Sequence, residues 1–370
     1  MEMKKLIYTY MQFKGFRCGL SIILLLIISC SIQKYDKNPE FSHVEFITET
    51  KKMPFQNNDD YYQFRKQTFR VDSIYYLSIW DLRNNNLTIF NIDNFEIVVN
   101  NNFTGLVSAS EIHHFDTIFL LYRDGRVVQT DTSFHIYKEW QLEPASEKYH
   151  IGEPLYIANN HVYAGYYPNH PLVTKERLTD YFSKPTIIEA SLDNPNIILN
   201  YYGKFPEVYL KHNYDVTPCR IAIIDNDVIT SFKETDNIYM NNKFVASIRS
   251  NYFTKNIEQD ITKIYDEEYK KKRATENCKY GSVLYNHYTG HYYRMFHFAT
   301  KYYNKDCTVN SSMDAKKSII VTDKDFNVLK EVILPPEYFI YDSYITHKGL
   351  MIKRENNNDK ENIYFDFFSL

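Results

Sequence analysis

The stretch TIFLLYRDGRVVQTDTSFHIYKEWQL, residues 117 to 142, indicates the fold more clearly than any other part of the chain. It contains short runs rich in aromatic and β-branched residues, which fit the half-buried surface of a β-sheet. Asp124-Gly125, a pair typical of tight hairpin turns, separates the first two runs, and the polar segment 131 to 133 precedes the third. The stretch therefore predicts antiparallel strands joined by tight turns.

The same order of short strands and polar turns recurs in both directions from this stretch. About six such units lie between Ile74 and Phe368, at a spacing near the ~40 to 50 residues of propeller blades. One sheet cannot bury both of its faces alone, whereas sheets stacked around an axis share a core. We therefore predict an all-β fold, a β-propeller of six or seven blades over residues 61–370. Because the units share no fixed motif, an irregular β-sandwich or two separate β domains remain as alternatives.

Residues 30–60 are polar and charged, contain Pro39 and Pro54, and are expected to form a tether ahead of the folded domain. A short segment within them, His43 to Thr48, has the composition of a strand. Closing a ring of blades would place the first strand of the chain beside the last. This segment is the candidate for that role.

Two interruptions of the strand pattern are expected to form short helical insertions. The first is Val173 to Phe182, which two prolines bracket. The second is Asn256 to Glu276, where Asn256 is a candidate cap and apolar residues recur at helical spacing. Its basic run, Lys270 to Arg273, fits either a solvated helix face or a contact with lipid headgroups or an acidic partner.

Residues 1–29 have the features of a lipoprotein signal peptide. Lys and Arg residues supply a positive region, and Leu20 to Ile28 supply an apolar core too short to span a bilayer. Ile27, Ile28 and Ser29 before Cys30 fit a bacterial lipobox, in which the signal is cleaved before the cysteine and the thiol carries a diacylglycerol. An uncleaved anchor or an ordinary signal peptide is the alternative.

Lipidation of Cys30 would anchor the chain without a transmembrane helix, because each buried methylene of an acyl chain contributes about 0.8 kcal/mol. Ser31 stands where an aspartate would indicate retention at the inner membrane. We therefore expect an outer-membrane lipoprotein of the cell envelope, with its periplasmic or surface face undetermined. Translation could start at Met1 or Met11, and either start leaves Cys30 at the mature N-terminus.

The charge of the mature chain limits its partners. Residues 1–29 hold four of the 43 Lys and Arg and one of the 46 Asp and Glu, so their removal leaves a net charge of −6. A nucleic-acid surface requires a clustered positive field, so no nucleic-acid partner is expected. The expected partners are an envelope protein or a carbohydrate and, through the N-terminal lipid, the membrane.

Three cysteines follow Cys30 in the sequence: Cys219, Cys278 and Cys307. An oxidising periplasm would allow a disulfide between Cys278 and Cys307, whereas free thiols are an equally open alternative. The sequence has no C-x-x-C motif, which zinc knuckles and thioredoxin-type sites use.

The sequence lacks the common motifs of catalysis and cofactor binding. It has no G-x-G-x-x-G, P-loop, G-x-S-x-G or H-E-x-x-H. Asp323, Asp325 and Asn327 resemble the start of a calcium loop, but Val328 stands where the turn of that loop needs Gly. We predict neither a metal nor a cofactor and assign no catalytic residue.

The richest polar constellation is YNHYTGHYYR, residues 285 to 294. Two histidines flank a turn within it, although two histidines without a carboxylate make a poor metal site. Exposed tyrosine rings could stack on sugar faces, but adjacent residues of a strand face opposite ways, so half of each Tyr pair belongs to the core. The candidate ligand-contact residues are Tyr292, Tyr293, Arg294, His287 and His291.

The same constellation carries a resemblance to a known family. The pattern Tyr285-Asn286-x-Tyr288-x-x-x-Tyr292-Tyr293-Arg294, followed by SIIVTDKDFNVLKEVILPPEY and THKGLMI, resembles Bacteroidetes lipoproteins classed only as a domain of unknown function. The similarity extends from about Ile74 to the C-terminus, although family members often have Asp where Asn286 stands. The resemblance implies a lipidated, propeller-like β protein on a bacterial envelope, and it supplies no catalytic residues.

Three functions are compatible with these observations. The first is a non-enzymatic module that binds or scaffolds an envelope protein or glycan at the outer membrane. The second is a glycan hydrolase or lyase, which would bring two carboxylates with shifted pKa values together in the propeller channel. The third is a structural role in an envelope complex, which would expose a contiguous apolar patch. The lack of catalytic motifs favours the first.

Overall fold

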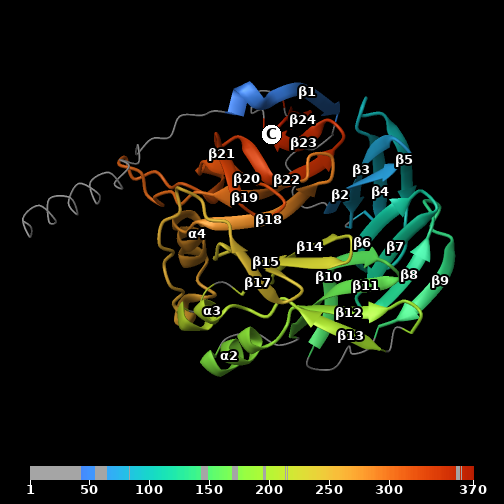
Figure 1. Cartoon of the computed structure of the whole chain (residues 1–370), viewed down its shortest axis with the longest axis horizontal. Helices are drawn as coiled ribbons and strands as arrows, with labels where there is room; N and C mark the ends of the chain where they lie inside the picture. The colour runs from blue at the N-terminus through green and yellow to red at the C-terminus, as the bar shows by residue number, and fades with distance from the viewer. Residues whose placement is uncertain are drawn as a thin grey trace, which may run out of the picture. The chain divides into compact units, whose positions relative to one another are not determined.

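The computed structural model describes residues 43–54, 65–82, 84–142, 149–168, 174–194, 197–212, 214, 216–355, 359 and 361–370. Their strands form six antiparallel sheets of four strands each. Figure 1 shows these sheets arranged around a common centre. The protein is a six-bladed β-propeller, so the predicted fold is confirmed and the sandwich and two-domain alternatives are wrong.

One strand of each sheet lies innermost, and these strands contact one another in a closed ring. With the blades numbered in chain order, the innermost strands are β2 (Arg65–Val71), β6 (Val107–His114), β10 (Tyr149–Ala158), β14 (Arg220–Ile224), β18 (Lys279–Asn286) and β22 (Tyr338–Thr346). Their side chains line the centre of the propeller.

The second strand of each sheet is covered on both faces, and six successive residues of β3 are buried. The second strands are β3 (Ile74–Asp81), β7 (Thr117–Tyr122), β11 (His161–Pro168), β15 (Asp227–Ser231), β19 (His291–His297) and β23 (Gly349–Arg354). The third strands are β4 (Asn86–Asn91), β8 (Arg126–Thr130), β12 (Ile187–Ser191), β16 (Asn237–Met240), β20 (Lys317–Thr322) and β24 (Asn362–Phe368).

The fourth strand of each sheet forms its outer edge and is more exposed, as β5 illustrates. In blades 1 to 5 the outer strands are β5 (Ile97–Asn102), β9 (Ile136–Gln141), β13 (Ile198–Tyr202), β17 (Lys243–Ser247) and β21 (Val328–Leu334). In blade 6 the outer strand is β1 (Ile47–Pro54), which comes from the start of the propeller sequence.

The ring closes by pairing β1 with β24, from Ile47 opposite Phe368 to Pro54 opposite Asn362. The prediction that an N-terminal strand closes the ring is therefore correct, but the strand is displaced from the predicted segment. Residues His43–Phe46 form a short 3-10 helix, and the strand follows it. Because β1 lies inside the stretch 30–60 expected to be a tether, the propeller includes residues before position 61.

A polar cluster joins blade 6 to blade 1 near this closure. Lys348, in the turn between β22 and β23, lies 3.0 Å from both Glu49 of β1 and Asp93 of blade 1. The lysine favours the ionised carboxylates, which lowers the pKa of Glu49 and of Asp93 against the opposing effect of desolvation.

The hydrophobic core lies between neighbouring blades. Leu121 and Val127 of blade 2, for example, pack in one buried cluster with Ile157, Val162 and Ile188 of blade 3. A single blade could not bury both faces of its sheet, so the blades depend on one another for their stability.

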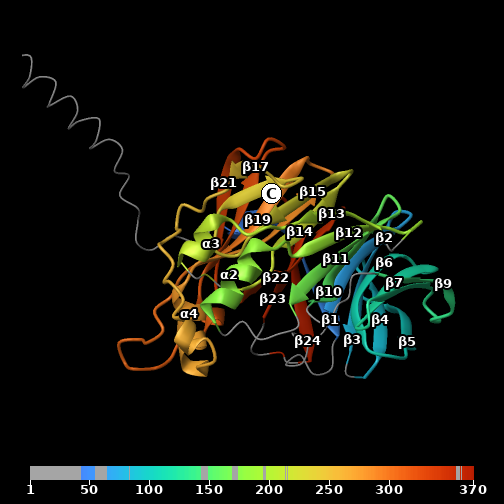
Figure 2. The same cartoon turned by 90° about the horizontal axis from the view of Figure 1, so that it is seen from below.

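Three α-helices interrupt the strands of the described chain: α2 (Lys175–Ser183), α3 (Glu207–His212) and α4 (Glu267–Glu276). In Figure 1 and in the turned view of Figure 2 they lie on one side of the propeller. The first predicted insertion corresponds to α2, whose cap is Thr174, and α3 was not predicted. No helix among the described residues is long and apolar enough to cross a membrane.

The second predicted insertion is shorter than expected. Its α-helix begins after Asp266, which caps it by accepting a hydrogen bond from the Tyr269 main-chain N–H, and only a 3-10 turn, Ile261–Lys263, precedes it. Asn256 is not a cap, because it is buried and its amide pairs with the main chain of Cys278. The apolar spacing misled the prediction: Ile257 and Tyr265 are 47% and 60% exposed.

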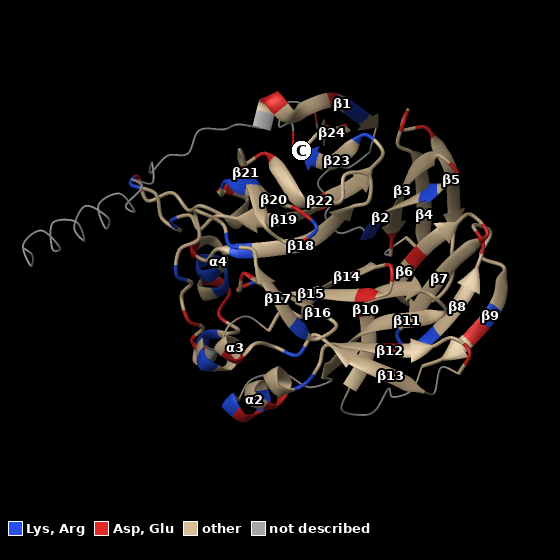
Figure 3. Cartoon of the chain, viewed as in Figure 1, with Lys and Arg blue, Asp and Glu red and all other residues tan. Residues whose placement is uncertain are grey.

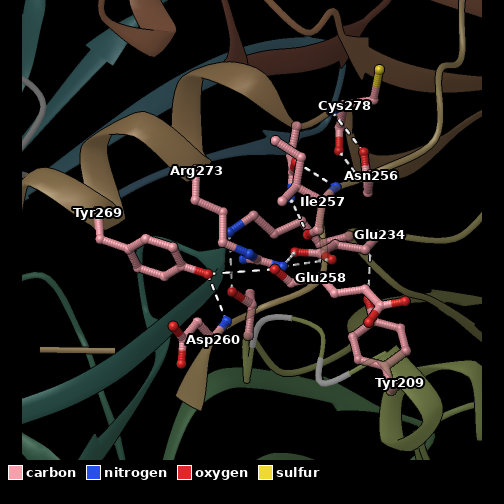
Figure 4. A network of polar contacts seen from close by, with 12 residues as sticks. Tyr209, Glu234, Asn256, Ile257, Glu258, Asp260, Tyr269, Arg273 and Cys278 are labelled. Atoms are coloured by element: carbon pink, nitrogen blue, oxygen red, sulfur yellow. Dashed lines mark hydrogen bonds and ion pairs between the residues drawn. The ribbon is translucent and has the colours of Figure 1, made fainter. Parts of the chain in front are cut away.

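A network of polar contacts holds this insertion on the propeller (Figure 4). Arg273 of α4 donates to both carboxylate oxygens of the buried Glu234, at 2.9 and 3.0 Å. The main-chain N–H of Asp260 donates to the Tyr269 hydroxyl at 2.6 Å. Of the predicted basic run, Arg273 therefore serves the interior of the protein, while Lys270 pairs with Glu267 on the surface.

Candidate binding cavity at the centre of the propeller

A cavity of about 860 Å³ lies at the end of the central channel where the inner strands begin. Its lining includes Arg65 and Arg220, the first residues of β2 and β14, and the residues just before β14. A second cavity of about 730 Å³ is lined by blades 1, 2, 3 and 6. The two cavities share lining residues, namely Arg65, Leu82, Glu153, Pro154 and Tyr156, so they adjoin one another.

Irregularities of the inner strands shape these cavities. The pairing register shifts in β6, β10, β18 and β22, which leaves extra residues on each inner strand opposite its neighbour. Residues in these bulged segments line the cavities, namely Ser108, Glu153, Pro154, Ser282, Tyr341 and Asp342. Because a bulge re-aims side chains and interrupts regular pairing, four blades direct polar groups toward the centre at this level.

Arginines from three blades line the larger cavity. Arg65 pairs with Glu153 at 3.0 Å, and Arg220 donates to the Ser282 hydroxyl at 3.3 Å. Arg123, which follows β7, is exposed and has no carboxylate partner among the described residues. Desolvation lowers the pKa of Arg65, and the positive charge of Arg123 lowers it further, against the attraction of Glu153.

The carboxylates of the smaller cavity are paired. Asp342 lies 3.0 Å from Lys66, and both side chains are only 7% exposed. Glu111 contacts His113 at 3.3 Å and accepts a hydrogen bond from the Ile157 main-chain N–H. Burial raises the pKa of Glu111, although both contacts oppose that rise. Each of these two acidic groups at the centre therefore has a basic partner.

Aromatic rings and a thiol complete the lining. The pKa of Tyr156 is raised to about 12 and that of Tyr167 is also raised, in both cases mainly by desolvation, so both hydroxyls are neutral at physiological pH. The Tyr341 ring is 42% exposed and lies 5.4 Å from the Arg220 guanidinium. Burial raises the pKa of Cys219 to about 12, which keeps its thiol protonated and makes it a poor nucleophile.

Three of the ligand-contact residues expected from the sequence belong to the core. Tyr292, Tyr293 and Arg294 lie on the second strand of blade 5 and are 6%, 0% and 0% exposed. Tyr292 stacks on Phe326 with ring centroids 4.5 Å apart, and Asn286 donates to the Tyr293 hydroxyl at 3.1 Å. Their burial is incompatible with contact to an external ligand, so these predictions are corrected.

His287 and His291 flank the β18–β19 turn as predicted, but neither lines the two central cavities. His287 packs against Tyr288 with ring centroids 4.0 Å apart, and desolvation together with the charge of Arg70 lowers its pKa. His291 pairs in register with Asn286. No group of His, Cys, Asp and Glu with the geometry of a metal site occurs in the described part of the chain.

The predicted disulfide is not formed. Cys278 and Cys307 are both free thiols; Cys278 is buried with its sulfur 3.4 Å from the Thr254 hydroxyl, and Cys307 is exposed in a turn. A bond would require the buried thiol to reach the surface. The predicted lipid-attachment site, Cys30, lies outside the described residues.

Sequence reasoning missed the cavity arginines. Arg65 belongs to a strand that the sequence pattern did not indicate, and Arg123 stands beside the predicted hairpin turn at Asp124-Gly125. The available signal was a cation at the start of an inner strand, as at Arg65 and Arg220. These arginines can be recognised as cavity residues only when it is known which strand of each blade is innermost.

Comparison with solved structures supports the fold. The crystal structure of a member of the DUF4221 family from Bacteroides vulgatus ATCC 8482 matches with a TM-score of 0.69 and 16% identity, over 87% of this chain and 97% of that chain. A protein from Bacteroides fragilis NCTC 9343 matches with a TM-score of 0.49 and 12% identity, over 90% and 98%. No family model and no curated protein matches this sequence. The first similarity agrees with the resemblance to Bacteroidetes proteins of unknown function noted from the C-terminal residues.

Proposed function

We propose that the protein is a lipid-anchored binding module of the cell envelope and that a glycan or a segment of an envelope protein enters its central cavity. The observation that carries the proposal is the cavity of about 860 Å³ at the start of the inner strands, with bulged segments from several blades directed into it. Ligand pockets are typically concave, of ~300 to 1,000 Å³, and combine apolar walls with a few polar groups.

Binding fits the lining better than hydrolysis does. A glycosidase needs two carboxyl groups with separate acid and base roles. Burial gives Glu111 a raised pKa, but Glu153 and Asp342 are paired with Arg65 and Lys66. An ion pair occupies a carboxylate, which suits recognition and rigidity rather than proton transfer.

A purely structural role is less well supported than a ligand-binding role. Exposed apolar side chains occur on the outer strands of five blades, which places them on separate edges around the ring. They include Ile97, Ile136, Leu199, Phe244 and Val328. A structural component would instead gather such residues into one patch.

The test of cavity binding is capture of envelope material by the mature chain made from Ser31 without the lipid. We expect the wild type to retain a glycan or an envelope protein, and the double variant Arg123→Glu/Tyr341→Ala to lose it. Arg126→Glu is the matched control, because Arg126 lies on the same hairpin outside the cavity and pairs with Glu139. Equal capture by all three proteins would contradict binding at the cavity.

The anchoring part of the proposal rests on the lipobox before Cys30. Metabolic labelling with an alkyne fatty acid should label the wild type and send it to the membrane fraction. Cys30→Ser should abolish both, whereas Cys18→Ser, which changes the cysteine before the apolar core, should abolish neither. Labelling that survives Cys30→Ser would refute the assigned attachment site.

A further inference from the structure

We infer that the ligand of the central cavity is an acidic saccharide, whose oxyanion is held by Arg65, Arg123 and Arg220 while its ring lies against tyrosine faces. The inference rests on the proposed binding function and narrows it to one class of ligand. It follows from the charge of the lining, from open hydrogen-bond donors, and from the position of the aromatic rings.

The larger cavity has an excess of positive charge. Its ionisable lining comprises three arginines and one glutamate, Glu153, together with His150, Cys219, Tyr156 and Tyr167. Glu153 pairs with Arg65, which leaves Arg123 and Arg220 without a carboxylate partner in the described part of the chain. The whole chain has a net charge of −3, so the positive charge of the cavity is opposite in sign to that of the protein. Figure 3 shows that many of the charged residues lie on the α-helices and turns, while most strand positions are uncharged.

The arginines of the cavity retain unused donors. The buried Nη1 of Arg65 and the buried Nε of Arg220 have no hydrogen-bond partner among the described residues. A buried donor without a partner costs free energy, which a ligand oxygen can recover. The fork of the guanidinium matches the paired oxygens of a carboxylate or phosphate, and charge-assisted bonds of this kind are strong.

An open donor alone does not mark a site, and Arg294 shows the difference. Its Nε also lacks a partner among the residues described, but its side chain is 0% exposed and lies 4.1 Å from the Tyr280 ring. No ligand could reach it without unfolding the blade. Arg65 and Arg220, in contrast, line an open cavity.

Tyrosines provide surfaces for the rest of the ligand. Tyr156 and Tyr167 line the same cavity as the arginines, and Tyr341 lies on the adjoining one, 5.4 Å from the Arg220 guanidinium. Aromatic rings offer apolar faces, and a tyrosine hydroxyl can bond to a sugar hydroxyl. The combination of cations and rings therefore suits a sugar that carries an acidic group.

The experiment is calorimetric titration of the mature chain from Ser31 with matched saccharides. The probes are galacturonate and glucuronate oligomers, a sugar phosphate, and the neutral galactose and glucose oligomers of the same length. We expect acidic probes to bind more tightly than neutral ones, with an affinity that falls as salt is added. Arg123→Gln should weaken binding of the acidic probe roughly tenfold to a hundredfold, and Arg126→Gln should leave it unchanged.

The outcomes separate this inference from the proposed function. Binding of uronates alone assigns a carboxylate, and binding of the sugar phosphate alone assigns a phosphate; either result supports the inference. Equal affinity for acidic and neutral oligomers, or no effect of Arg123→Gln, would overturn it while leaving a binding module. No saccharide binding together with cavity-dependent capture of an envelope protein would also overturn it. Capture that does not depend on the cavity would overturn the proposed function itself.

Discussion

Two groups of buried charges differ in how completely the protein satisfies them. Inside blade 5, Arg294 donates to four main-chain carbonyls, those of Phe232, Thr235, Asp236 and Ile248, at 2.5 to 3.5 Å. In the central cavity, Arg220 donates a single hydrogen bond among the described residues, to the Ser282 hydroxyl, and its buried Nε has no partner there. The first arrangement joins blade 5 to blade 4, and the second is open to a ligand.

A buried carboxylate inside a blade is also held by several hydrogen bonds. Glu189 of blade 3 is 5% exposed, and each of its two oxygens accepts two hydrogen bonds. The donors are His161, Tyr163, Asn200 and Tyr202, at 2.7 to 3.0 Å. A charge within a blade is therefore structural, whereas the arginines that line the open cavity are available for function.

The largest expected effect on stability is that of removing the buried Arg294 guanidinium, which donates to four main-chain carbonyls. Arg294→Met should lower the free energy of unfolding by about 4 kcal/mol, because it leaves several carbonyls without their donor in a buried site. Urea denaturation measures the change, with Arg249→Met as the control, since Arg249 is exposed and next to Ile248. Equal stability of the two variants would contradict the claim that the buried charge of Arg294 stabilises the fold.

The ion pair between Lys66 and Asp342 sharpens the comparison, because it is buried but lies at the cavity. Lys66→Met alone should cost about 3 kcal/mol, since it leaves a buried carboxylate without its cation. Adding Asp342→Leu should restore part of that loss. A double-mutant cycle in urea measures the coupling, and strictly additive losses would show that the two charges do not stabilise each other.

The pH dependence of Glu189 should produce a smaller effect. Four donors hold its folded pKa below the ordinary value of 4.5, although desolvation opposes them. The ionised form therefore contributes stability above pH 4.5, and this contribution is lost as the pH falls through the folded pKa. Glu189→Gln should be less stable than the wild type by about 1 to 2 kcal/mol at pH 6.

The difference between these two proteins should narrow between pH 4.5 and pH 3, as measured by thermal denaturation at each pH. The control Glu139→Gln changes an exposed carboxylate that pairs with Arg126, and it should follow the wild type. A constant difference for Glu189→Gln across this range would contradict the assigned pKa shift.

The smallest expected effect on stability is at the cavity itself. Arg123→Gln should change the free energy of unfolding by less than about 0.5 kcal/mol, because its exposed guanidinium supports no element of the described fold. Differential scanning fluorimetry of the unliganded protein measures this. A large loss of stability would show that Arg123 stabilises the fold, as the charges inside the blades do.

Much of the fold could be predicted from the sequence, but little of the candidate binding site could. Local signals such as Asp124-Gly125 fix hairpins, and the aromatic and β-branched runs on either side of this pair form β7 and β8. Even the closing strand was expected near its true position, although His43–Phe46 form a 3-10 helix and the strand begins at Ile47. These features depend on near neighbours in the sequence, which is why they could be predicted.

The site depends on register and on position within the blade, which local patterns do not reveal. Tyr292, Tyr293 and Arg294 were conspicuous because they cluster in the sequence, yet they lie on a second strand, where both faces are covered. Ser282 and Asp342 became cavity residues through register shifts in β18 and β22. A shift of this kind is a property of paired strands, so it emerges only in three dimensions.

The closure of the ring has a consequence for the order in which the protein can be completed during synthesis. Strand β1 (Ile47–Pro54) is made early, whereas its partner β24 (Asn362–Phe368) is the last strand of the propeller to be made. Blades 1 to 5 consist of contiguous sequence and can assemble as the chain emerges. Blade 6 cannot form until β24 is available to pair with β1, so a ribosome or export channel that still holds β24 also keeps the ring open.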